Sequence, residues 1–285
     1  MTVQTRQLSL TLVGPGRAGK AFARSWMEAG GRIAEVVSPT KAAAAAAARE
    51  LGAGDPAGIA LAVASGDILV VAVPDDEIPA AARSLAGRTS CRAVFHLSGA
   101  LPAARLEALG GSGAALGSLH PLRVFSGRPG ENWRGAFVAI EGDERAVALG
   151  EGIVRDIGAR GRRIRAEDKP LYHAAAALAA GGTVSLVALA ARVWEKVGIP
   201  PEESREALAG LAAEAAAAAA AQPFEVALTG PVARRDLATV RAHCEVLAED
   251  PDLLRVYGLL AEETLRRTPG RGREEEIRAL LHRGC

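Results

Sequence analysis

The sequence has few cysteines and no excess of charge of one sign, and each shortage excludes a class of protein. Its three cysteines, Cys91, Cys244 and Cys285, lie far apart and form no CxxC pair, which is typical of reduced thiols in the cytoplasm. A formal net charge of +1 argues against nucleic acid and against an anionic membrane surface as partners. We therefore expect a cytoplasmic protein that binds neither.

Signals for metal binding, secretion and membrane insertion are also scarce. The N-terminus MTVQTRQ has no apolar stretch of the kind found in signal peptides, and we expect no uncharged apolar run of membrane-spanning length. The five histidines show no HxxxH or HxH spacing, so we expect no metal site. They are His96, His120, His173, His243 and His282.

Two kinds of pattern divide the chain. The first half alternates β-rich runs with helical runs, which predicts right-handed crossovers and a doubly wound sheet. Beyond this region the sequence reads as long helices, so we predict an α/β Rossmann-like domain at 1–160 and an all-helical domain at 161–285. The strands are expected at 8–13, 32–37, 67–74, 92–99, 114–121 and 136–142, with a weak one at 162–166.

The stretch LVGPGRAGKAFA, residues 12–23, follows a predicted strand and opens a predicted helix. In that context Gly14-x-Gly16-x-x-Gly19 is typical of a dinucleotide-binding turn, in which a pyrophosphate approaches the backbone and the helix N-terminus. A glycine turn without a ligand is the alternative. The predicted cofactor contacts here are Gly14, Pro15, Gly16, Arg17, Ala18 and Gly19.

The second strand ends in VVSPTK, with Ser38, Thr40 and Lys41 but no acid to hold the ribose hydroxyls of NAD. Hydroxyls beside a cation suit a 2′-phosphate, and Arg17 offers a second cation. We therefore predict NADP rather than NAD as the cofactor. Lys41 as a solvated residue at a helix start is an equal alternative.

The third landmark is VAVPDDEI at 71–78, a strand that ends where the nicotinamide half of the cofactor would lie. It adds Val73, Pro74 and Asp75 to the predicted cofactor contacts. Asp75 and Asp76 as caps of the next helix are an equal alternative.

Two more strand ends carry reactive side chains, FHLSGA with His96 and GSLHPL with His120. The proline after His120 holds its backbone extended, and an imidazole can transfer a proton beside a hydride acceptor near neutral pH. We predict that His120 is an acid or base and that His96 is structural.

The helical half opens with EDKPLYHAAAALAAGG at 167–182, where Lys169 and His173 lie four residues apart on one helix face. A polar tip ahead of an alanine face suggests a helix whose start enters the cleft. We predict that Lys169 and His173 fix the substrate, with His173 also a second candidate acid.

A polar loop, ALTGPVARRD at 227–236, offers Thr229, Arg235 and Asp236 to a polar substrate; a plain helix-breaking loop is the alternative. The alanine-rich helix at 211–221 suits close packing, including packing against a second subunit.

These motifs together resemble a family of bacterial Rossmann-like oxidoreductases with a helical C-terminal domain of unknown function, DUF2520. The family is similar to pyrroline-5-carboxylate reductases, ketopantoate reductases and prephenate dehydrogenases. The resemblance implies NADP binding and a homodimer formed through the helical domain. GSLHP resembles the His-Pro segment of prephenate dehydrogenases, which implies proton transfer by His120 and a neighbouring hydrogen bond from Ser98.

One departure concerns the helix after YHAAA, where the family pattern has a Ser-Asn pair and this sequence has Ala180 and Gly181. Thr183 or Ser185 could take over the role of the missing asparagine.

The leading hypothesis is an NADP-dependent oxidoreductase acting on a small polar carbonyl, imine or hydroxy acid. The alternative is an NADP-binding sensor or partner-binding dimer without turnover. A methyltransferase is a weaker third hypothesis.

Overall fold

The computed structural model describes residues 7–270 and 272–283, which form two compact units, Met1–Leu178 and Ala179–Cys285. The boundary between the units lies later in the chain than the predicted one after residue 160. The physical reason is that the helix starting at Lys169 is still bonded to the sheet by its first turn, as described below.

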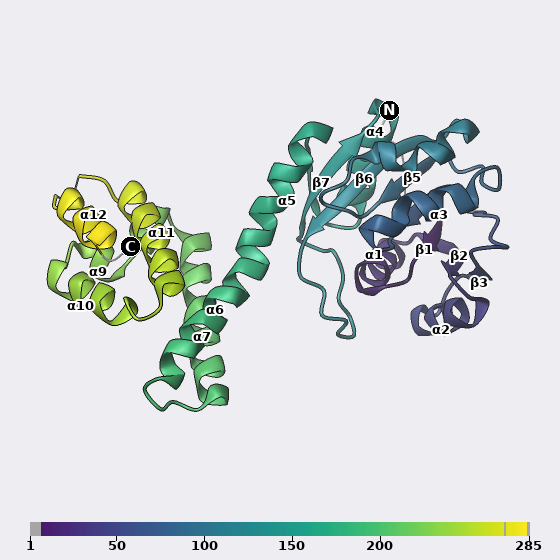
Figure 1. Cartoon of the computed structure of the whole chain (residues 1–285). Coiled ribbons are helices and arrows are strands. Elements are labelled where there is room, and N and C mark those ends of the chain that lie inside the picture. The colour runs from purple at the N-terminus through teal and green to yellow at the C-terminus, as the bar shows by residue number, and fades with distance from the viewer. Residues whose placement is uncertain (1–6, 271, 284–285) are drawn as a thin grey trace. The chain divides into compact units, whose positions relative to one another are not determined.

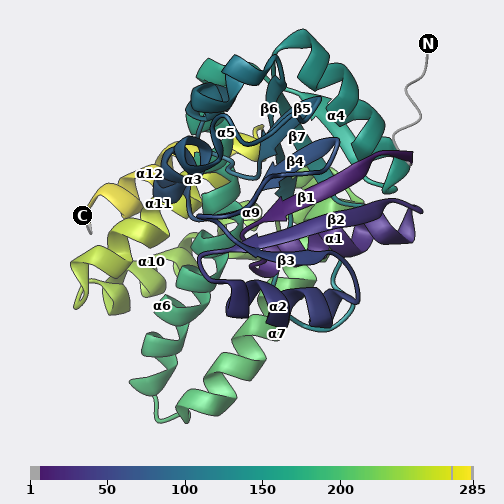
Figure 2. The ribbon, with the colours of Figure 1, turned by 90° about the vertical axis from the view of Figure 1, so that its right-hand side faces the viewer.

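The first unit contains an eight-stranded sheet with the strand order β3-β2-β1-β4-β5-β6-β7-β8 (Figures 1 and 2). Neighbouring strands run parallel except for β6 and β7, which are antiparallel. Figure 2 shows β3, β2, β1 and β4 side by side. The strands are β1 (Ser9–Val13), β2 (Arg32–Ser38), β3 (Asp55–Gly58), β4 (Ile68–Val71), β5 (Ala93–His96), β6 (Ala115–Leu122), β7 (Phe137–Gly142) and β8 (Arg160–Arg163).

Helices cover both faces of this sheet, because successive strand residues point to opposite faces. Leu12 and Val36 belong to an apolar cluster with α1, α2 and α4, whereas Val13 and Val37 belong to a cluster with α3 and η3. The first unit is thus a three-layer α/β structure. Its helices are α1 (Arg17–Glu28), α2 (Lys41–Leu51), η2 (Asp75–Glu77), α3 (Ile78–Leu85), η3 (Ala103–Ser112), α4 (Glu144–Asp156), η4 (Ala166–Asp168) and α5 (Lys169–Ala177).

The predicted Rossmann-like sheet is confirmed, with three differences in detail. β7 is antiparallel to β6 because a loop, and not a helix, joins residues 122 and 137. β3 was not predicted, since Asp55, Pro56 and Gly58 are residues that strands disfavour. β8 begins at Arg160, two residues before the predicted strand.

The second unit is helical, as predicted, and its apolar core contains Val240, Leu254, Leu265 and Ile277. In Figure 1 the helices from α9 to α12 are drawn in yellow-green to yellow. The elements are η5 (Leu178–Gly182, a π-helical turn at the unit boundary), α6 (Thr183–Glu195), α7 (Pro201–Ala221), α8 (Phe224–Ala227), α9 (Gly230–Arg234), α10 (Leu237–Leu247), α11 (Pro251–Arg267) and α12 (Glu274–Arg283).

The segment Ala166–Glu195 forms one helical run of 30 residues, long and apolar enough to cross a membrane by length and composition alone. None of its most apolar window is buried within the chain. The expectation that no uncharged apolar run reaches membrane-spanning length is therefore wrong, whereas the expectation that the protein does not bind a membrane stays a prediction. The polar tip and the two glycines at 181 and 182 obscured the length of the run in the sequence.

Candidate functional site

Three strand ends bring polar side chains to the carboxyl edge of the sheet in the first unit. β4, β5 and β6 lie side by side, with His96 paired to Ser118 in the register of β5 and β6. Ser98 and His120 each follow two residues later, and Asp75 begins η2 after β4. Parallel strands therefore place Asp75, Ser98 and His120 at one edge, as expected for a ligand crevice.

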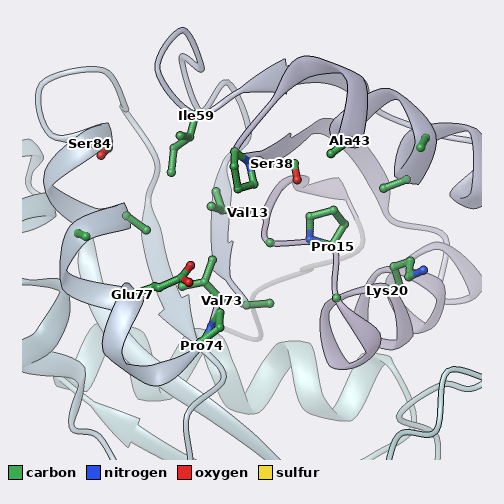
Figure 3. Close-up of a pocket in the computed structure, with 18 of the residues that line it drawn as sticks. Val13, Pro15, Lys20, Ser38, Ala43, Ile59, Val73, Pro74, Glu77 and Ser84 are labelled. Atoms are coloured by element: carbon green, nitrogen blue, oxygen red, sulfur yellow. The ribbon is translucent and has the colours of Figure 1, made fainter.

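A cavity of about 790 Å³ lies beside this edge, next to the glycine turn between β1 and α1. Figure 3 shows Pro15 and Ser38 near its centre, with Lys20 of α1 on one side and Glu77 and Ser84 on the other. Its lining comes from the ends of β1, β2 and β4 and from α1, α2 and α3. Doubly wound sheets bind nucleotides at the carboxyl edge of their strands, at the point where the order of the strands along the sheet reverses.

The glycine turn is shaped for close approach of a ligand. Gly14 has a φ of +81°, and a Cβ there would lie 2.7 Å from the carbonyl oxygen of Ala72. A Cβ on Gly19 would lie 2.7 Å from the carbonyl oxygen of Gly14. A Cβ on Gly16 would meet nothing within 4 Å, and no side chain caps α1. The first turn of α1 thus offers its N–H groups on an open side, as a pyrophosphate requires.

Half of the predicted cofactor contacts line the cavity. These are Gly14, Pro15, Gly16, Ser38, Val73 and Pro74. The other six are not in the lining of this cavity: Arg17, Ala18, Gly19, Thr40, Lys41 and Asp75.

The cations predicted for a 2′-phosphate lie near the cavity without lining it. Thr40 caps α2 by accepting a hydrogen bond from the backbone N–H of Ala43, so its hydroxyl oxygen has a structural partner. Lys41 follows it and is exposed. Arg17 is also exposed, and its Nη1 lies 3.4 Å from the carbonyl oxygen of Phe125.

Sequence reasoning missed part of the lining, namely Lys20, Glu50 and an alanine face of α2. Lys20 and Arg24 contact the Glu50 carboxylate at 2.6 and 2.8 Å, and the Lys20 hydrogen bond lowers the pKa of Glu50. The spacing of Ala43, Ala46 and Ala47 was a usable signal, because residues three and four apart share one helix face.

Lys169 is the most buried charged group of the edge, with an exposed fraction of 0%. Its Nζ donates to the carbonyl oxygen of Ser98 at 3.0 Å and to Oγ of Ser118 at 2.6 Å. The Glu141 carboxylate lies 4.0 Å away and accepts a hydrogen bond from Ser118. Burial lowers the pKa of Lys169 to about 8, against the opposing charges of Glu141 and Asp75. The ammonium thus ties α5 to β6, to β7 and to Ser98 in the segment that follows β5.

Ser98 links this group to the end of β4. Its hydroxyl donates to Asp75 at 2.7 Å and accepts from the backbone N–H groups of Ala100 and Leu101. Asp75 therefore has a side-chain partner at the sheet edge. No side-chain cap hydrogen bond is found at η2 or α3, so the alternative of Asp75 as a helix cap is not realised there.

His120 lies next to two side chains of α5. Its Nδ1 is 3.0 Å from the hydroxyl of Tyr172, and its ring centre is 5.8 Å from that of His173. Burial, together with the charges of His173 and Lys169 and against the charge of Asp75, lowers the pKa of His120 to about 4. Burial also raises the pKa of Tyr172. Burial of the ring thus favours the neutral imidazole of His120.

The structure brings together all four predicted catalytic residues, His120, His173, Ser98 and Lys169, within the first unit. Lys169 is enclosed and bonded to the sheet, which suits a positioning role better than direct contact with a substrate. Tyr172, which contacts His120, was not among the predicted site residues.

The predicted substrate loop lies in the second unit. Arg235, 4% exposed, donates through both Nη atoms to Thr268 and through Nη2 to Glu274, and it also bonds the carbonyl oxygen of Val232. Asp236 caps α10 through Thr239. These contacts give both side chains structural roles within their own unit.

Several other predicted positions have local partners. Thr229 precedes α9, and its contact with a substrate stays a prediction. Thr183, a candidate replacement for the missing asparagine, donates its hydroxyl to the carbonyl oxygen of Ala179. In the described ranges, 7–270 and 272–283, no group of three or more His, Cys, Asp or Glu side chains is suited to a metal ion.

The class of protein follows from the glycine turn, the crevice and the strand order, which define a Rossmann-like unit. Residues 1–121 match the profile of the Rossmann-like domain. Residues 136–264 match the domain of unknown function DUF2520. The chain thus joins a Rossmann-like domain to a DUF2520 domain, and the resemblance noted from its motifs is confirmed.

Solved structures share this fold along nearly the whole chain. Protein TM1727 from Thermotoga maritima has a TM-score of 0.71 at 24% identity, covering 95% of this chain and 98% of its own. A candidate NADP oxidoreductase from Bacteroides fragilis has a TM-score of 0.72 at 22% identity, covering 92% and 99%.

A third structure is the reductive aminase from Aspergillus terreus in complex with NADPH and ethyl-5-oxohexanoate. Its TM-score is 0.63 at 20% identity, covering 95% of this chain and 98% of its own. At these identities the likeness is one of fold. No curated protein sequence matches the chain.

Proposed function

We propose that this chain is an NADP-dependent oxidoreductase that moves a hydride to or from a small polar carbonyl, imine or hydroxy acid. The observation that carries the proposal is the cavity at the glycine turn, which lies at the same sheet edge as the cluster of Asp75, Ser98, Lys169 and His120. Hydride and proton transfer need a nucleotide site near titratable side chains whose pKa values are shifted from their ordinary values.

The residues present fit a dinucleotide. Gly14 and Gly16 leave the backbone open to a pyrophosphate at the N-terminus of α1. Ser38 in the lining would face the ribose, with Lys41 and Arg17 as exposed cations for a 2′-phosphate. No acid stands at the end of β2, where an NAD site would place one.

The bound nicotinamide would supply or accept the hydride. The chain's own residues would handle the proton, because His120 and its neighbours lie at the same edge of the sheet as the cavity. Lys169 and Ser98 would hold the edge in place through their bonds to each other, to β6 and to η2. His173, whose ring lies near His120, is the candidate for contact with the substrate.

A sensor without turnover is the second candidate function. The cavity alone would serve a sensor equally well, and Ala180 and Gly181 in place of Ser-Asn favour it. The buried network around Lys169 favours the enzyme, because burying a charged group costs free energy that a plain binding site does not require.

The first experiment is a titration of the purified protein with NADPH and with NADH, followed by nicotinamide fluorescence and thermal stability. We expect tighter binding of NADPH. Lys41→Ala and Arg17→Ala should each weaken NADPH binding by about tenfold and leave NADH binding unchanged, since each removes one contact of a charged pair. Arg49→Ala, an exposed cation in the last turn of α2, is the matched control.

A second variant tests the pocket itself. Gly16→Val should preserve the fold, because a Cβ there meets no atom within 4 Å and Gly16 has a φ of −73°. It should abolish NADPH binding by filling the side that the pyrophosphate approaches. Unchanged binding in Gly16→Val, or no binding by the original protein, would end the oxidoreductase proposal.

We also propose that the protein is a homodimer formed through its helical region. α6 has no buried residue and α7 buries only Ser204 and Leu208, which leaves Val184 and Leu211 70% and 63% exposed. Exposed apolar helix faces of this extent mark an interaction surface, and the small alanine side chains of α7 allow a second copy to approach closely. A cytoplasmic location stays a prediction.

Light scattering of the purified protein tests the dimer. The original chain should be dimeric, and the double variant Val184→Glu with Leu211→Glu should be monomeric. Leu259→Glu on α11, at a site 68% exposed, is the control and should remain dimeric. A monomeric original chain that binds lipid vesicles would instead assign the 30-residue helix to a membrane.

A further inference from the structure

Tyr172 presents a hydroxyl group at the sheet edge, next to His120. Its oxygen lies 3.0 Å from Nδ1 of His120, and the two rings are nearly perpendicular, with centres 5.5 Å apart and an angle of 88°. Tyr172 is in the first turn of α5, and Lys169 in the same turn fastens that turn to the sheet. Because the first turn of α5 is fixed to the sheet, the Tyr172 hydroxyl is held in contact with the His120 imidazole.

The opposite edge of the imidazole faces the backbone of Gly99. A Cβ on Gly99 would lie 2.8 Å from both Cε1 and Nε2 of His120, and 2.7 Å from Cδ2 of His173. The absence of a side chain at Gly99 is what allows the two imidazoles to lie there. Because Nε2 of His120 lies against the Gly99 backbone, Nδ1 and the Tyr172 hydroxyl are the polar atoms of the pair on the other side of the ring.

The charged groups around the pair favour a neutral histidine and a protonated tyrosine. His120 has Lys169 and His173 of α5 and Asp75 of η2 as its titratable neighbours, and burial of the ring, aided by Lys169 and His173, disfavours an imidazolium. Burial keeps the Tyr172 hydroxyl protonated. A neutral imidazole carries one proton, on either Nδ1 or Nε2, and the tautomer decides which atom of the pair can give a proton away.

We propose that Tyr172 is the proton donor of the reaction and that His120 donates its Nδ1 proton to the tyrosine oxygen. This inference rests on the proposed oxidoreductase function. Because Nδ1–H points at the phenol oxygen, the phenol's own proton is left for a substrate. His120 then stabilises the negative charge that forms on the tyrosine oxygen, as a preorganised donor does.

The step balances in atoms and electrons. The hydride brings two electrons and forms the new C–H bond, and the π pair of the C=O or C=N bond moves to its oxygen or nitrogen. That atom forms a bond to the phenolic proton as the O–H bond of Tyr172 breaks. The phenolate then takes a proton from water, which restores the starting state. In the oxidation direction the same transfers run in reverse.

The first test reads the tautomer directly and needs no substrate. Long-range ¹H–¹⁵N correlation spectra of the histidine rings, recorded at neutral pH with and without saturating NADPH, distinguish protonated from bare ring nitrogens. His120→Asn identifies the His120 signals. We expect a neutral ring with its proton on Nδ1. A proton on Nε2 would mean that Tyr172 donates to His120, and an imidazolium would mean that His120 is the acid; either result overturns the inference.

The second test compares the chain's two tyrosines during turnover. NADPH oxidation is followed with a panel of small cyclic imines, ketones and 2-keto acids. Tyr172→Phe should lower kcat by about 100-fold or more and leave NADPH affinity unchanged, since general acid catalysis contributes on that scale. Tyr257→Phe, which removes a tyrosine hydroxyl bonded to His243 in the other unit, should change kcat by less than about twofold.

Failure of this inference can be told apart from failure of the proposed function. If the original protein binds NADPH and reduces a member of the panel while Tyr172→Phe keeps its kcat, only the role of Tyr172 is refuted. If the original protein does not bind NADPH, the oxidoreductase proposal fails, and the inference fails with it.

Discussion

The two units each hold a tyrosine against a histidine in almost the same geometry. In the helical unit the Tyr257 hydroxyl lies 3.0 Å from Nδ1 of His243, with ring centres 5.7 Å apart and an angle of 84°. In the Rossmann-like unit the distances for Tyr172 and His120 are 3.0 and 5.5 Å, and the angle is 88°. Geometry alone therefore does not separate a catalytic pair from a structural one.

The surroundings of the two pairs differ. His120 has Lys169, His173 and Asp75 as titratable neighbours, and burial with these neighbours lowers its pKa to about 4. Tyr257 packs beside the apolar core of the helical unit, where burial, aided by the neighbouring Cys244, raises its pKa to about 12. One pair lies among groups that can carry charge at the edge of a sheet, and the other lies beside a core.

The largest expected effect separates the two histidines by turnover. His120→Ala removes the hydrogen-bond donor that stabilises the negative charge on Tyr172 and should lower kcat by about 10²- to 10³-fold, the usual loss when one such donor is removed. His243→Ala should leave kcat within about twofold. Steady-state NADPH oxidation checks both, with NADPH affinity measured in parallel. Equal losses in the two variants would show that the surroundings do not distinguish the pairs.

The next effect concerns the buried charge beside His120. The pKa of Lys169 is about 8 in the folded state, against an ordinary value of 10.5. Between these pH values the unfolded chain binds a proton that the folded chain does not, so stability rises with pH across this window. Lys169→Met should remove that rise, which amounts to at most about 3 kcal/mol because each pKa unit corresponds to about 1.4 kcal/mol.

Urea unfolding at about pH 8 and about pH 10 measures the slope. Lys196→Met, which alters an exposed lysine at the end of α6, is the matched control and should keep the slope of the original protein. A slope unchanged in Lys169→Met would mean that its ammonium is not held at a desolvation cost, contrary to its full burial.

A smaller effect follows from the glycine behind His120. Gly99→Ala places a methyl group 2.7–2.8 Å from the imidazoles of His120 and His173, so one of the rings must shift. We expect a loss in kcat of about tenfold, since small displacements of catalytic groups slow turnover. NADPH affinity should not change. Gly111→Ala in η3, where a Cβ meets nothing within 4 Å, should leave turnover unaffected, and a similar loss there would point to a general effect on the fold.

The sequence predicted the parts of the fold that depend on local pattern. The apolar runs gave β1, β2 and β4 to β7, and the glycine spacing located the turn at Gly14. It missed the direction of β7 and the existence of β3, because both depend on which strand lies alongside rather than on the residues themselves.

The site was predictable to the level of residue types at strand ends. His120 and Ser98 were recognisable because strand ends gather at one edge. The sequence did not indicate that Lys169 turns inward to bond Ser118, or that Arg235 is bonded within its own unit. Both depend on long-range contacts whose partners lie 33 to 51 residues away along the chain.

The smallest effect tests the structural member of the comparison. Tyr257→Phe removes one hydrogen bond beside the core and leaves Nδ1 of His243 without its tyrosine partner, so we expect a loss of stability of about 1 kcal/mol. Urea unfolding measures the loss, and kcat should not change. If Tyr257→Phe instead lowered turnover at unchanged stability, the helical pair would belong to a site as well. The contrast between an edge and a core could then no longer explain why similar geometries serve different ends.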